Sequence, residues 1–585
     1  MSRPHIYLHP QCGACGDDFS LGQKIVAVIR KTRSIQVINA YTFPDYGVSD
    51  DTVPDIDWYF CRKPSCSQCN DGAAEAATIH VDCYNLFRQR CKTNNSLYRL
   101  WLTATWRRPW HGAPSLRLAP DVDANQTMQL AATACSLPQL TAVPGEILRM
   151  IGEYAQPSPL SRYRTVLDLV AVSNSQELSR QLSLPLSKIA SWERGGHAVA
   201  NKNLHPIVRT TVDNWGLKRI EGLAENPPFT GKRSDTEVYI IETQERLRGV
   251  VVQFKSGLAR LDIPKESANL QLWDTPTPPP LESLRNMPKI TSTTQFGTID
   301  LRRANALTFF VANGSTLAVH GHTRRRPRPQ ATFDRLSRQR QRHTAWIYVP
   351  IPSKDRITHF GIRAPHRFTK SPWAVADYSY LFRFELAGDV MIGSHFLGPT
   401  QDFLWPVKEQ LLLIFNMAEL AAISTMSAYP NQSNEITPFA RFSKPPFQEA
   451  CFSSAPLENI SLLQIYSDAE TGLCRGMLAE YSNGSQRTLG ECRIGLDPVC
   501  NYKNPACFCF TQVTRNRPGT AIELKGAKVS STCEPEHKHA EEGWSCFPMH
   551  GTIQFWFTNE QSILEVILDE VEPRPSCGCP LQELC

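Results

Sequence analysis

Two short pairs with the same spacing, far apart in the sequence, limit most strongly how this chain can fold. Cys12-Gly-Ala-Cys15 places two thiols three positions apart, and His80-Val-Asp-Cys83 repeats that spacing. A Cys-x-x-Cys turn directs both sulfur atoms at one point, and structural zinc takes four nitrogen or sulfur ligands in a tetrahedron. The second pair fits the start of a helix, where a thiolate is favoured. We therefore predict one structural zinc ion bound by Cys12, Cys15, His80 and Cys83, the alternative being ordinary thiols and a surface histidine.

Three further cysteines, Cys61, Cys66 and Cys69, follow the first pair. They form a candidate second metal site that lacks an obvious fourth ligand, although Cys91 is available, or one of them replaces a ligand of the first site. The sequence leaves open whether they bind metal.

The other cysteines and histidines predict no metal site. Cys507 and Cys509 lie two apart and are expected as thiols in the core or at the edge of a strand. His537 and His539 stand among acidic residues, which is typical of a solvated loop. His320 and His322 would share a strand face without a nearby carboxylate, which argues against a metal there.

The number of cysteines bears on the cellular compartment. A chain of 585 residues with 19 cysteines has little need of a disulfide framework, and the odd number argues against full pairing. The N-terminus lacks the apolar core of a signal peptide, and no run of 18 apolar residues occurs. We expect a cytoplasmic or nuclear protein with reduced thiols and no membrane partner.

Positive charge is concentrated in one stretch of the chain. Residues 324–342 contain eight arginines and one aspartate, so this stretch alone exceeds the net charge of +6 and the rest is close to neutral. A nucleic-acid-binding domain spreads its basic charge over a folded face, so we expect no nucleic-acid partner. The stretch is interpreted as either a nuclear localisation signal or a disordered loop.

The length predicts several domains, and the residue patterns divide the chain. Apolar residues at helical spacing after Pro144 predict a helical region over 138–225. Beyond Asp235, short alternating runs separated by Gly, Pro, Asn and Ser are typical of strands joined by tight turns. The segments 246–261 and 473–489 each predict a β-hairpin, because a Ser-Gly or Asn-Gly turn separates two strand patterns.

The expected fold is multidomain α+β. It comprises a small zinc-stabilised N-terminal module (1–120), a short helical region (138–225), a large antiparallel β-sandwich region (235–572) and a cysteine-rich tail (573–585).

The segment from Val143 to Trp192 resembles an F-box, the helical motif that docks on the Skp adaptor of cullin–RING ubiquitin ligases. The matching residues are Val143, Pro144, Glu146, Ile147, Leu148 and Ile151 in the opening, Leu169, Val172 and Ser173 in the middle, and Trp192 at the end. The resemblance implies an adaptor contact made by Pro144, Ile147, Leu148, Ile151, Leu169 and Trp192. Two features depart from the motif: Val143 stands where Leu is usual, and residues 156–164 lengthen the first connection.

The layout of most of the chain is also similar to a group of filamentous-fungal F-box-like proteins. These carry an N-terminal CxxCG and HxxC pair, a helical middle and a long β-rich C-terminal part. "CGACG", "IHVDCYNLF", "VPGEIL" and "YSNGSQRTLGECRIG" carry the likeness here. It implies an architecture and supplies no reaction.

No phosphate loop, dinucleotide-binding loop, HExxH or GxSxG motif is present. We therefore expect a non-catalytic binding protein, an F-box-like adaptor that recruits a protein substrate of unknown identity through its β region. The alternatives are a zinc-containing nuclear regulatory protein and a carbohydrate-binding β-sandwich. The second alternative depends on exposed aromatic side chains, for which the candidates are Trp273, Trp405, Trp544 and Trp556.

Overall fold

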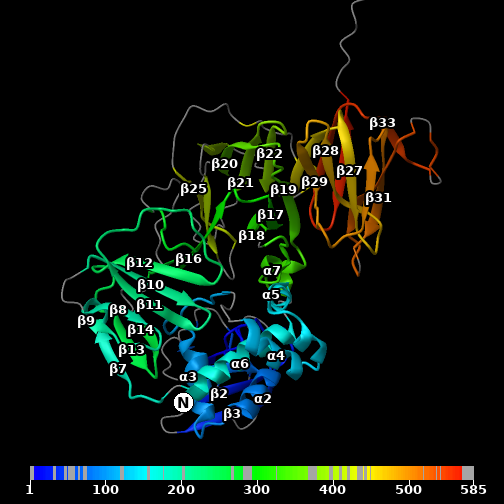
Figure 1. Cartoon of the computed structure of the whole chain (residues 1–585). Helices are drawn as coiled ribbons and strands as arrows, with labels where there is room; N and C mark the ends of the chain where they lie inside the picture. Colours follow the sequence, from blue (N-terminus) through cyan, green and yellow to red (C-terminus); the bar gives the residue numbers. More distant parts are fainter. Residues whose placement is uncertain are drawn as a thin grey trace, which may run out of the picture. The chain divides into compact units, whose positions relative to one another are not determined.

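The computed structural model describes residues 5–30, 34–44, 49–50, 59–62, 66, 68–69, 75–118, 124–154, 158–175, 177–200, 205–264, 269–280, 293–324, 326–365, 378–393, 399–407, 411–417, 422–430, 439, 445–447, 449–517, 519–534, 537–539 and 542–568. The chain divides into two units, one formed by residues 1–279 and 289–297 and the other by 280–288 and 298–585 (Figure 1). Strands far outnumber helices in the described residues, so the prediction of a β-rich protein is confirmed. The predicted tail 573–585 lies outside them.

The N-terminal part of the first unit is layered around one strand whose interior is buried on both faces. The elements are β1 (His5–Tyr7), β2 (Lys24–Arg30), β3 (Ile35–Thr42), β4 (Ser49–Asp50), β5 (Tyr59–Cys61), β6 (Ala76–His80), α2 (Val81–Arg90) and α3 (Ser96–Trp106). In β2, Val26 and Val28 pack with the helices, whereas Ile25, Ala27 and Ile29 pack with residues of β1 and β5. An unbroken apolar run such as "IVAVI" is what a strand covered on both sides requires.

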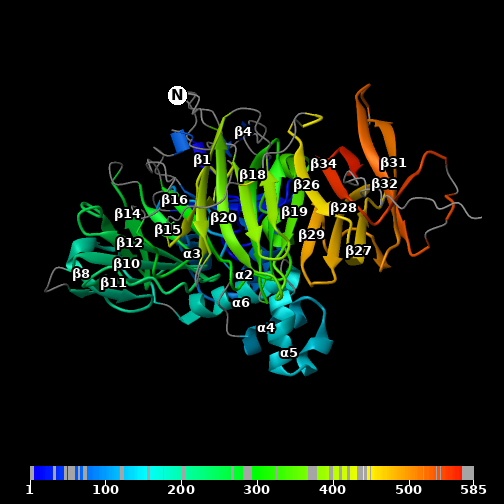
Figure 2. The same cartoon turned by 90° about the horizontal axis from the view of Figure 1, so that it is seen from above.

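A helical region follows, and its helices lie side by side in both views (Figures 1 and 2). It consists of α4 (Ala124–Ala134), the short 3-10 helix η1 (Pro138–Ala142), α5 (Gly145–Tyr154) and α6 (Pro159–Ser175). Leu169 and Val170 of α6 are buried in the same core as Met128 of α4. The helix α5 begins directly after Pro144, as predicted.

The prediction of a helical region was wrong beyond Ser175. The chain there forms β7 (Leu182–Pro185), η2 (Leu186–Lys188), β8 (Ile189–Glu193), β9 (Val199–Ala200), β10 (Ile207–Asp213) and β11 (Gly216–Leu223). Leucines at 182, 184 and 186 alternate with a period of two, and Pro185 cannot lie inside a helix. The long β region that follows the helices therefore begins at Leu182 rather than after Asp235.

The first unit continues with further strands, which are β12 (Glu237–Thr243), β13 (Val251–Lys255), β14 (Leu258–Asp262), β15 (Gln271–Trp273) and the start of β16 (Thr294–Asp300). The order of neighbours is β15-β12-β10-β11-β8-β9 in one sheet and β14-β13-β7 in another. Both sheets bury side chains in one core, to which Trp192, Ile220 and Val252 contribute.

A buried carboxylate joins the N-terminal layers to this β part within the first unit. The Glu75 carboxylate accepts from Arg260 of β14 at 2.7 and 2.9 Å and lies 3.1 Å from Arg108. Burial alone would raise the pKa of Glu75, but the two guanidinium groups hold it at about 2. Residues 1–120 thus belong to the same compact unit as this β part.

The second unit is built from antiparallel strands. These are β17 (Ala306–Ala312), β18 (Ser315–His322), β19 (Ala345–Pro350), β20 (Ile357–Pro365), β21 (Ser379–Phe384), β22 (Asp389–Gly393), β23 (Thr400–Pro406), β24 (Leu412–Met417), β25 (Met426–Tyr429), β26 (Cys451–Pro456), β27 (Ile460–Ser467), β28 (Cys474–Tyr481), β29 (Gln486–Gly490), β30 (Val499–Lys503), β31 (Cys507–Asn516), β32 (Glu523–Thr532), β33 (Ser545–Pro548), β34 (Thr552–Phe557) and β35 (Ser562–Ile567). The sheets β18-β17-β19, β22-β21-β20-β23, β26-β34-β35, β29-β28-β27-β30 and β32-β31-β33 all contribute to one large hydrophobic core.

Both predicted hairpins are present. Strands β13 and β14 pair across Ser256 and Gly257, which both have positive φ, as a type I′ turn requires. Strands β28 and β29 also pair antiparallel to each other. The longer connection between them contains Gly484, whose φ is 85°.

The arginine-rich stretch 324–342 is folded where the structure describes it. It forms two short helices, α7 (Gln330–Phe333) and α8 (Arg338–Gln341). The Phe333 ring lies 4.7 Å from that of Trp346, and Leu336 is buried. The interpretation as a disordered loop is therefore wrong for these residues, and the nuclear signal stays a prediction.

Among the helices of the described residues, none combines the length and apolarity needed to cross a membrane.

Candidate metal centres

The four residues predicted as zinc ligands converge in the structure. We call Cys12, Cys15, His80 and Cys83 centre 1; their ligand atoms all lie within 4.8 Å of one another. His80 ends β6 and Cys83 lies in the first turn of α2, which follows without a loop. The His80 backbone N–H donates to the Cys12 sulfur at 3.4 Å, and the Cys15 sulfur lies 3.5 Å from His80 Nδ1. The matched spacing of the two pairs thus corresponds to one cluster in space.

Glycine is required in the Cys12–Cys15 turn because the turn packs directly against α3. A Cβ at Gly13 would lie 2.5 Å from the Ala104 Cβ, closer than real side chains approach. The Gly13 N–H donates to the Thr78 carbonyl of β6 at 2.8 Å, and the Gly16 N–H donates to the Cys12 carbonyl. The turn is therefore held between a strand and a helix before any metal is considered.

Centre 1 is deeply buried, and its surroundings favour thiolate at one position. No ligand residue is more than 2% exposed. Burial opposes ionisation, but hydrogen bonds from Cys15 and Cys83 hold the pKa of Cys12 well below its usual value. Burial raises the pKa of Cys15, and hydrogen bonding with Cys12 raises that of Cys83. The Arg107 guanidinium donates to the carbonyls of Cys12 and Gly13 and adds positive charge beside the sulfurs.

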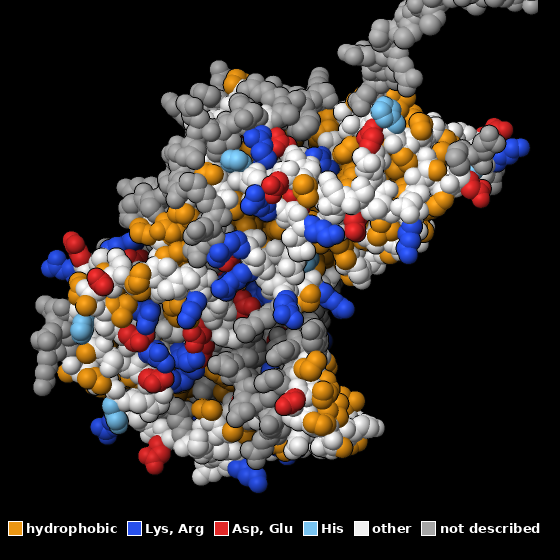
Figure 3. All heavy atoms as spheres, turned by 45° about the horizontal axis from the view of Figure 1, so that its top comes forward, with side chains coloured by type: hydrophobic (Ala, Val, Ile, Leu, Met, Phe, Trp, Pro, Cys, Tyr) orange, Lys and Arg blue, Asp and Glu red, His pale blue; other side chains and the backbone are white. Residues whose placement is uncertain are grey.

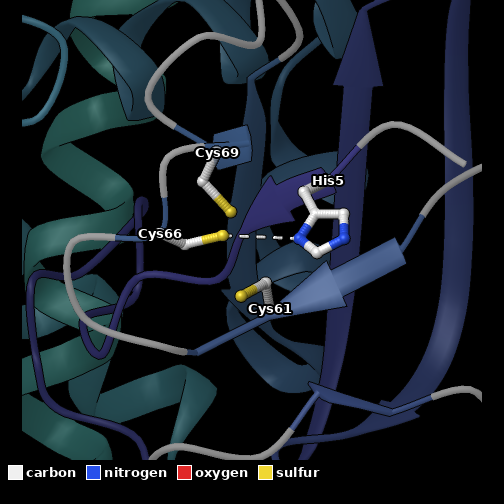
Figure 4. A group of neighbouring side chains, drawn as sticks. All are labelled: His5, Cys61, Cys66 and Cys69. Carbon is white, nitrogen blue, oxygen red and sulfur yellow. Dashed lines mark hydrogen bonds between the residues drawn. The ribbon is translucent and has the colours of Figure 1, made fainter. Parts of the chain in front are cut away.

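A histidine, His5, lies beside the three cysteines of the candidate second site and provides a fourth candidate ligand. We call His5, Cys61, Cys66 and Cys69 centre 2; their ligand atoms also lie within 4.8 Å of one another (Figure 4). The Cys66 sulfur lies 3.5 Å from His5 Nδ1. Strands β1 and β5 run parallel in register, with His5 opposite Tyr59, and this pairing brings the histidine to the cysteines.

Cys91 is not part of centre 2. Its thiol lies 3.3 Å from Thr93 Oγ1, and its side chain is buried among the helices. The suggestion that Cys91 completes the second site was wrong. His5 was missed because no local spacing links it to residues 61–69; only the pairing of two distant strands does.

The two centres lie in different layers of the N-terminal part of the first unit. Cys12, Cys15 and Cys83 belong to the core shared by β2 and the helices. Centre 2 lies on β1 and the end of β5, whose Ile6 and Phe60 fill the core on the other face of β2.

A third cluster, centre 3, occurs in the second unit and consists of Cys509, His537, His539 and Cys546. The structure thus brings the two histidines expected in a solvated loop, and a cysteine expected as an ordinary strand thiol, close enough together to hold a metal ion. The register of β31 and β33 places Cys509 directly opposite Cys546, which the spacing of the cysteines does not reveal. His320 and His322, in contrast, bond to Thr332 and Thr308 and to backbone carbonyls, and they join no metal cluster among the described residues.

All the described cysteines lack disulfide bonds in this structure.

The residues implied as adaptor contacts fall into two groups. Leu148, Leu169 and Trp192 are buried, so an adaptor cannot touch them in this structure, and Trp192 lies on β8 in the β core. Pro144 is exposed, Ile151 is half-buried and Ile147 is 46% exposed. The implied contact made by Leu148, Leu169 and Trp192 is thus corrected: they stabilise the fold.

Other exposed apolar side chains lie on the same helical region as Ile147. We call Leu130, Leu137, Ile147 and Met150 the α4–α5 apolar patch; each is between 41% and 50% exposed. Hydrophobic side chains gather on this helical region at the lower right of Figure 3. A helix on a protein surface normally turns polar side chains outward, so this patch is unusual.

The tryptophans that suggested carbohydrate binding do not form a platform. Trp273, Trp405 and Trp556 are at most 3% exposed, and Trp544 is half-buried and stacked on His539. This removes the observation on which the carbohydrate alternative depended.

No protein-family model matches the chain, and no curated protein matches it significantly. The functional interpretation therefore depends on the residues themselves.

Proposed function

We propose that this chain is a non-catalytic, zinc-stabilised adaptor that docks on a Skp-type protein through the α4–α5 apolar patch and recruits a protein substrate through its β region. The observation that carries the proposal is that Ile147 and Met150, three positions apart on α5, are both about half exposed. Leu148 on the same helix is buried and fixes α5 against α4 and α6. An exposed cluster of large apolar side chains marks a surface where proteins bind.

The identity of the partner is proposed from the F-box resemblance. The α5 part of the patch stands where the F-box opening residues occur in the sequence, and Pro144 directly precedes α5. The helical order differs from the motif, because α4 precedes α5 and a strand stands where the motif closes at Trp192. An adaptor contact would therefore be made by α4, η1 and α5 alone.

Zinc is the proposed metal of centres 1 and 2. Each offers three thiols and one imidazole, the soft donors that zinc prefers and that magnesium or calcium does not. Four protein ligands leave no open position for a substrate, so the role is structural. Centre 1 would hold the helices on β2, and centre 2 would hold β1 and β5 on its other face.

The docking proposal is tested with the purified chain and a purified Skp-type adaptor. Ile147→Asp combined with Met150→Asp should weaken binding more than about tenfold, because buried apolar anchors dominate protein interfaces. Leu148→Asp is unsuitable, since Leu148 is 1% exposed and its substitution would disrupt the fold. Leu182→Asp is the matched control, because Leu182 is an exposed leucine outside the patch. Failure of the unaltered chain to bind the adaptor would contradict the proposal.

A further inference from the structure

Two cysteines face each other across a pair of strands in the second unit. Cys509 of β31 and Cys546 of β33 are direct partners in the antiparallel register. Residues opposite each other in such a pair have Cβ atoms about 5 Å apart and point to the same face of the sheet. The sheet itself thus fixes one half of a ligand set.

Two histidines of the segment between β32 and β33 complete it. His537 Nε2 lies 3.0 Å from the Cys509 sulfur, and His539 Nε2 lies 3.3 Å from the Cys546 sulfur. The two Nε2 atoms are 3.1 Å apart. All four ligand atoms lie within 4.8 Å of one another, although they come from three separate segments.

Neighbouring groups orient both imidazoles. His537 Nδ1 lies 3.2 Å from the Glu534 carbonyl, which only accepts, so Nδ1 carries the proton and Nε2 presents a lone pair to the thiols. The ring of His539 is stacked on the indole of Trp544, with centroids 4.3 Å apart. Fixing the far side of a ligating histidine in this way is typical of metal sites.

We propose that Cys509, His537, His539 and Cys546 form a third zinc site, of the Cys2His2 type, which fastens the segment between β32 and β33 to the sheet. Two thiolates and two neutral imidazoles satisfy tetrahedral zinc and leave no open position. A cation at the centre would also accept the Nε2 lone pairs of His537 and His539, which otherwise face each other. Unlike centre 1, this site lies at the surface, since Cys546 is exposed and both histidines are half-buried. The metal therefore orders a surface segment and is accessible to chelators.

Zinc content of the purified full-length chain tests this site. With centres 1 and 2 filled, we expect three zinc ions per chain, and two in Cys546→Ser combined with His539→Ala. Cys533→Ser is the matched control, because Cys533 is exposed and close in sequence yet bonds to the Lys503 carbonyl instead. The proposal is overturned if the double variant and the control contain the same amount of zinc.

The rate of tryptic cleavage provides a second test of this site, which does not depend on whether centres 1 and 2 contain zinc. Lys538 lies between the two histidines, so zinc should protect the bond after it from trypsin. We expect cleavage there at least about tenfold faster in the double variant than in Cys533→Ser, because a released segment opens locally. Equal cleavage rates in the two variants would also contradict the proposal.

Discussion

In centre 1 and in centre 3, four candidate ligand atoms lie within 4.8 Å of one another, but centre 1 is buried whereas centre 3 is partly exposed. In centre 1 every ligand residue is buried, and the Cys12–Cys15 turn fits against α3 with no space for a methyl group at Gly13. In centre 3 only Cys509 is buried, and the two histidines come from a surface segment. With zinc at both centres, as we propose, the burial of the ligands rather than their number determines whether the metal stabilises a folded core or only fastens a surface segment.

The largest effect should come from removing all metal with a strong chelator. Structural zinc supplies about 10 kcal/mol or more of apparent folding free energy, and a whole domain has about 5–15 kcal/mol in reserve. We expect the layers around β2 to unfold while β17–β35 keep their hydrogen bonds. Hydrogen exchange, resolved by peptide, measures both regions in one sample. Protection of β2 that survives complete removal of zinc would show that centre 1 does not hold this fold.

Centre 2 should give an intermediate effect, because its ligands are partly exposed. His5→Ala should remove one zinc ion and lower the free energy of unfolding of the first unit by at least about 3 kcal/mol, as losses of a metal do. Zinc analysis and denaturant unfolding measure the two quantities. Cys91→Ser is the control and should keep the full zinc content; loss of one ion from this control would mean that Cys91 is a ligand after all.

A smaller effect is expected from Gly13→Ala, which leaves every ligand in place. The new Cβ meets Ala104, and overpacking of this kind costs about 1–3 kcal/mol. Ala104→Gly in the same chain should recover part of the loss by making room, whereas Ala104→Gly alone only destabilises α3. Thermal unfolding of the four chains gives the coupling, and strictly additive effects would mean that the two residues do not touch.

The smallest change in global stability should follow disruption of centre 3. Cys546→Ser should alter the free energy of unfolding of the second unit by less than about 1 kcal/mol, since the metal proposed there fastens only a surface segment, whose local opening leaves the hydrophobic core intact. A loss as large as that expected at centre 2 would contradict the contrast between buried and exposed centres.

The sequence predicts all four residues of centre 1 and three of the four of centre 2, but it does not predict centre 3, and the reason is physical. Cys12, Cys15, His80 and Cys83 form two local pairs, each of which directs two ligands by its own backbone. His5 reaches centre 2 only through the parallel pairing of β1 with β5, and Cys546 reaches Cys509 only through the register of β33 on β31. Such pairings depend on the packing of the whole sheet, and local spacing does not encode them.

The same distinction explains which elements the sequence predicts. The helix α5 was predicted because Pro144, directly before it, and the helical periodicity of its ten residues agree. The segment 182–193 was misread because Leu186, Ile189 and Trp192 have helical spacing, whereas the alternation of Leu182, Leu184 and Leu186 and the presence of Pro185 were overlooked. In the structure the segment pairs with β13 and β11. The two hairpins were predicted because Ser-Gly and Asn-Gly turns determine local geometry.

The ion pair of Glu75 with Arg260 has a consequence for how the chain is made. Its partners are 185 residues apart. At translation rates of about 5–20 residues per second, Glu75 is added to the chain roughly 10 to 40 seconds before Arg260. All the ligands of centres 1 and 2 are synthesised before Arg260. We therefore expect the nascent chain to bind its first zinc ions during synthesis, while Glu75 still lacks Arg260 and the N-terminal layers are exposed to chaperones.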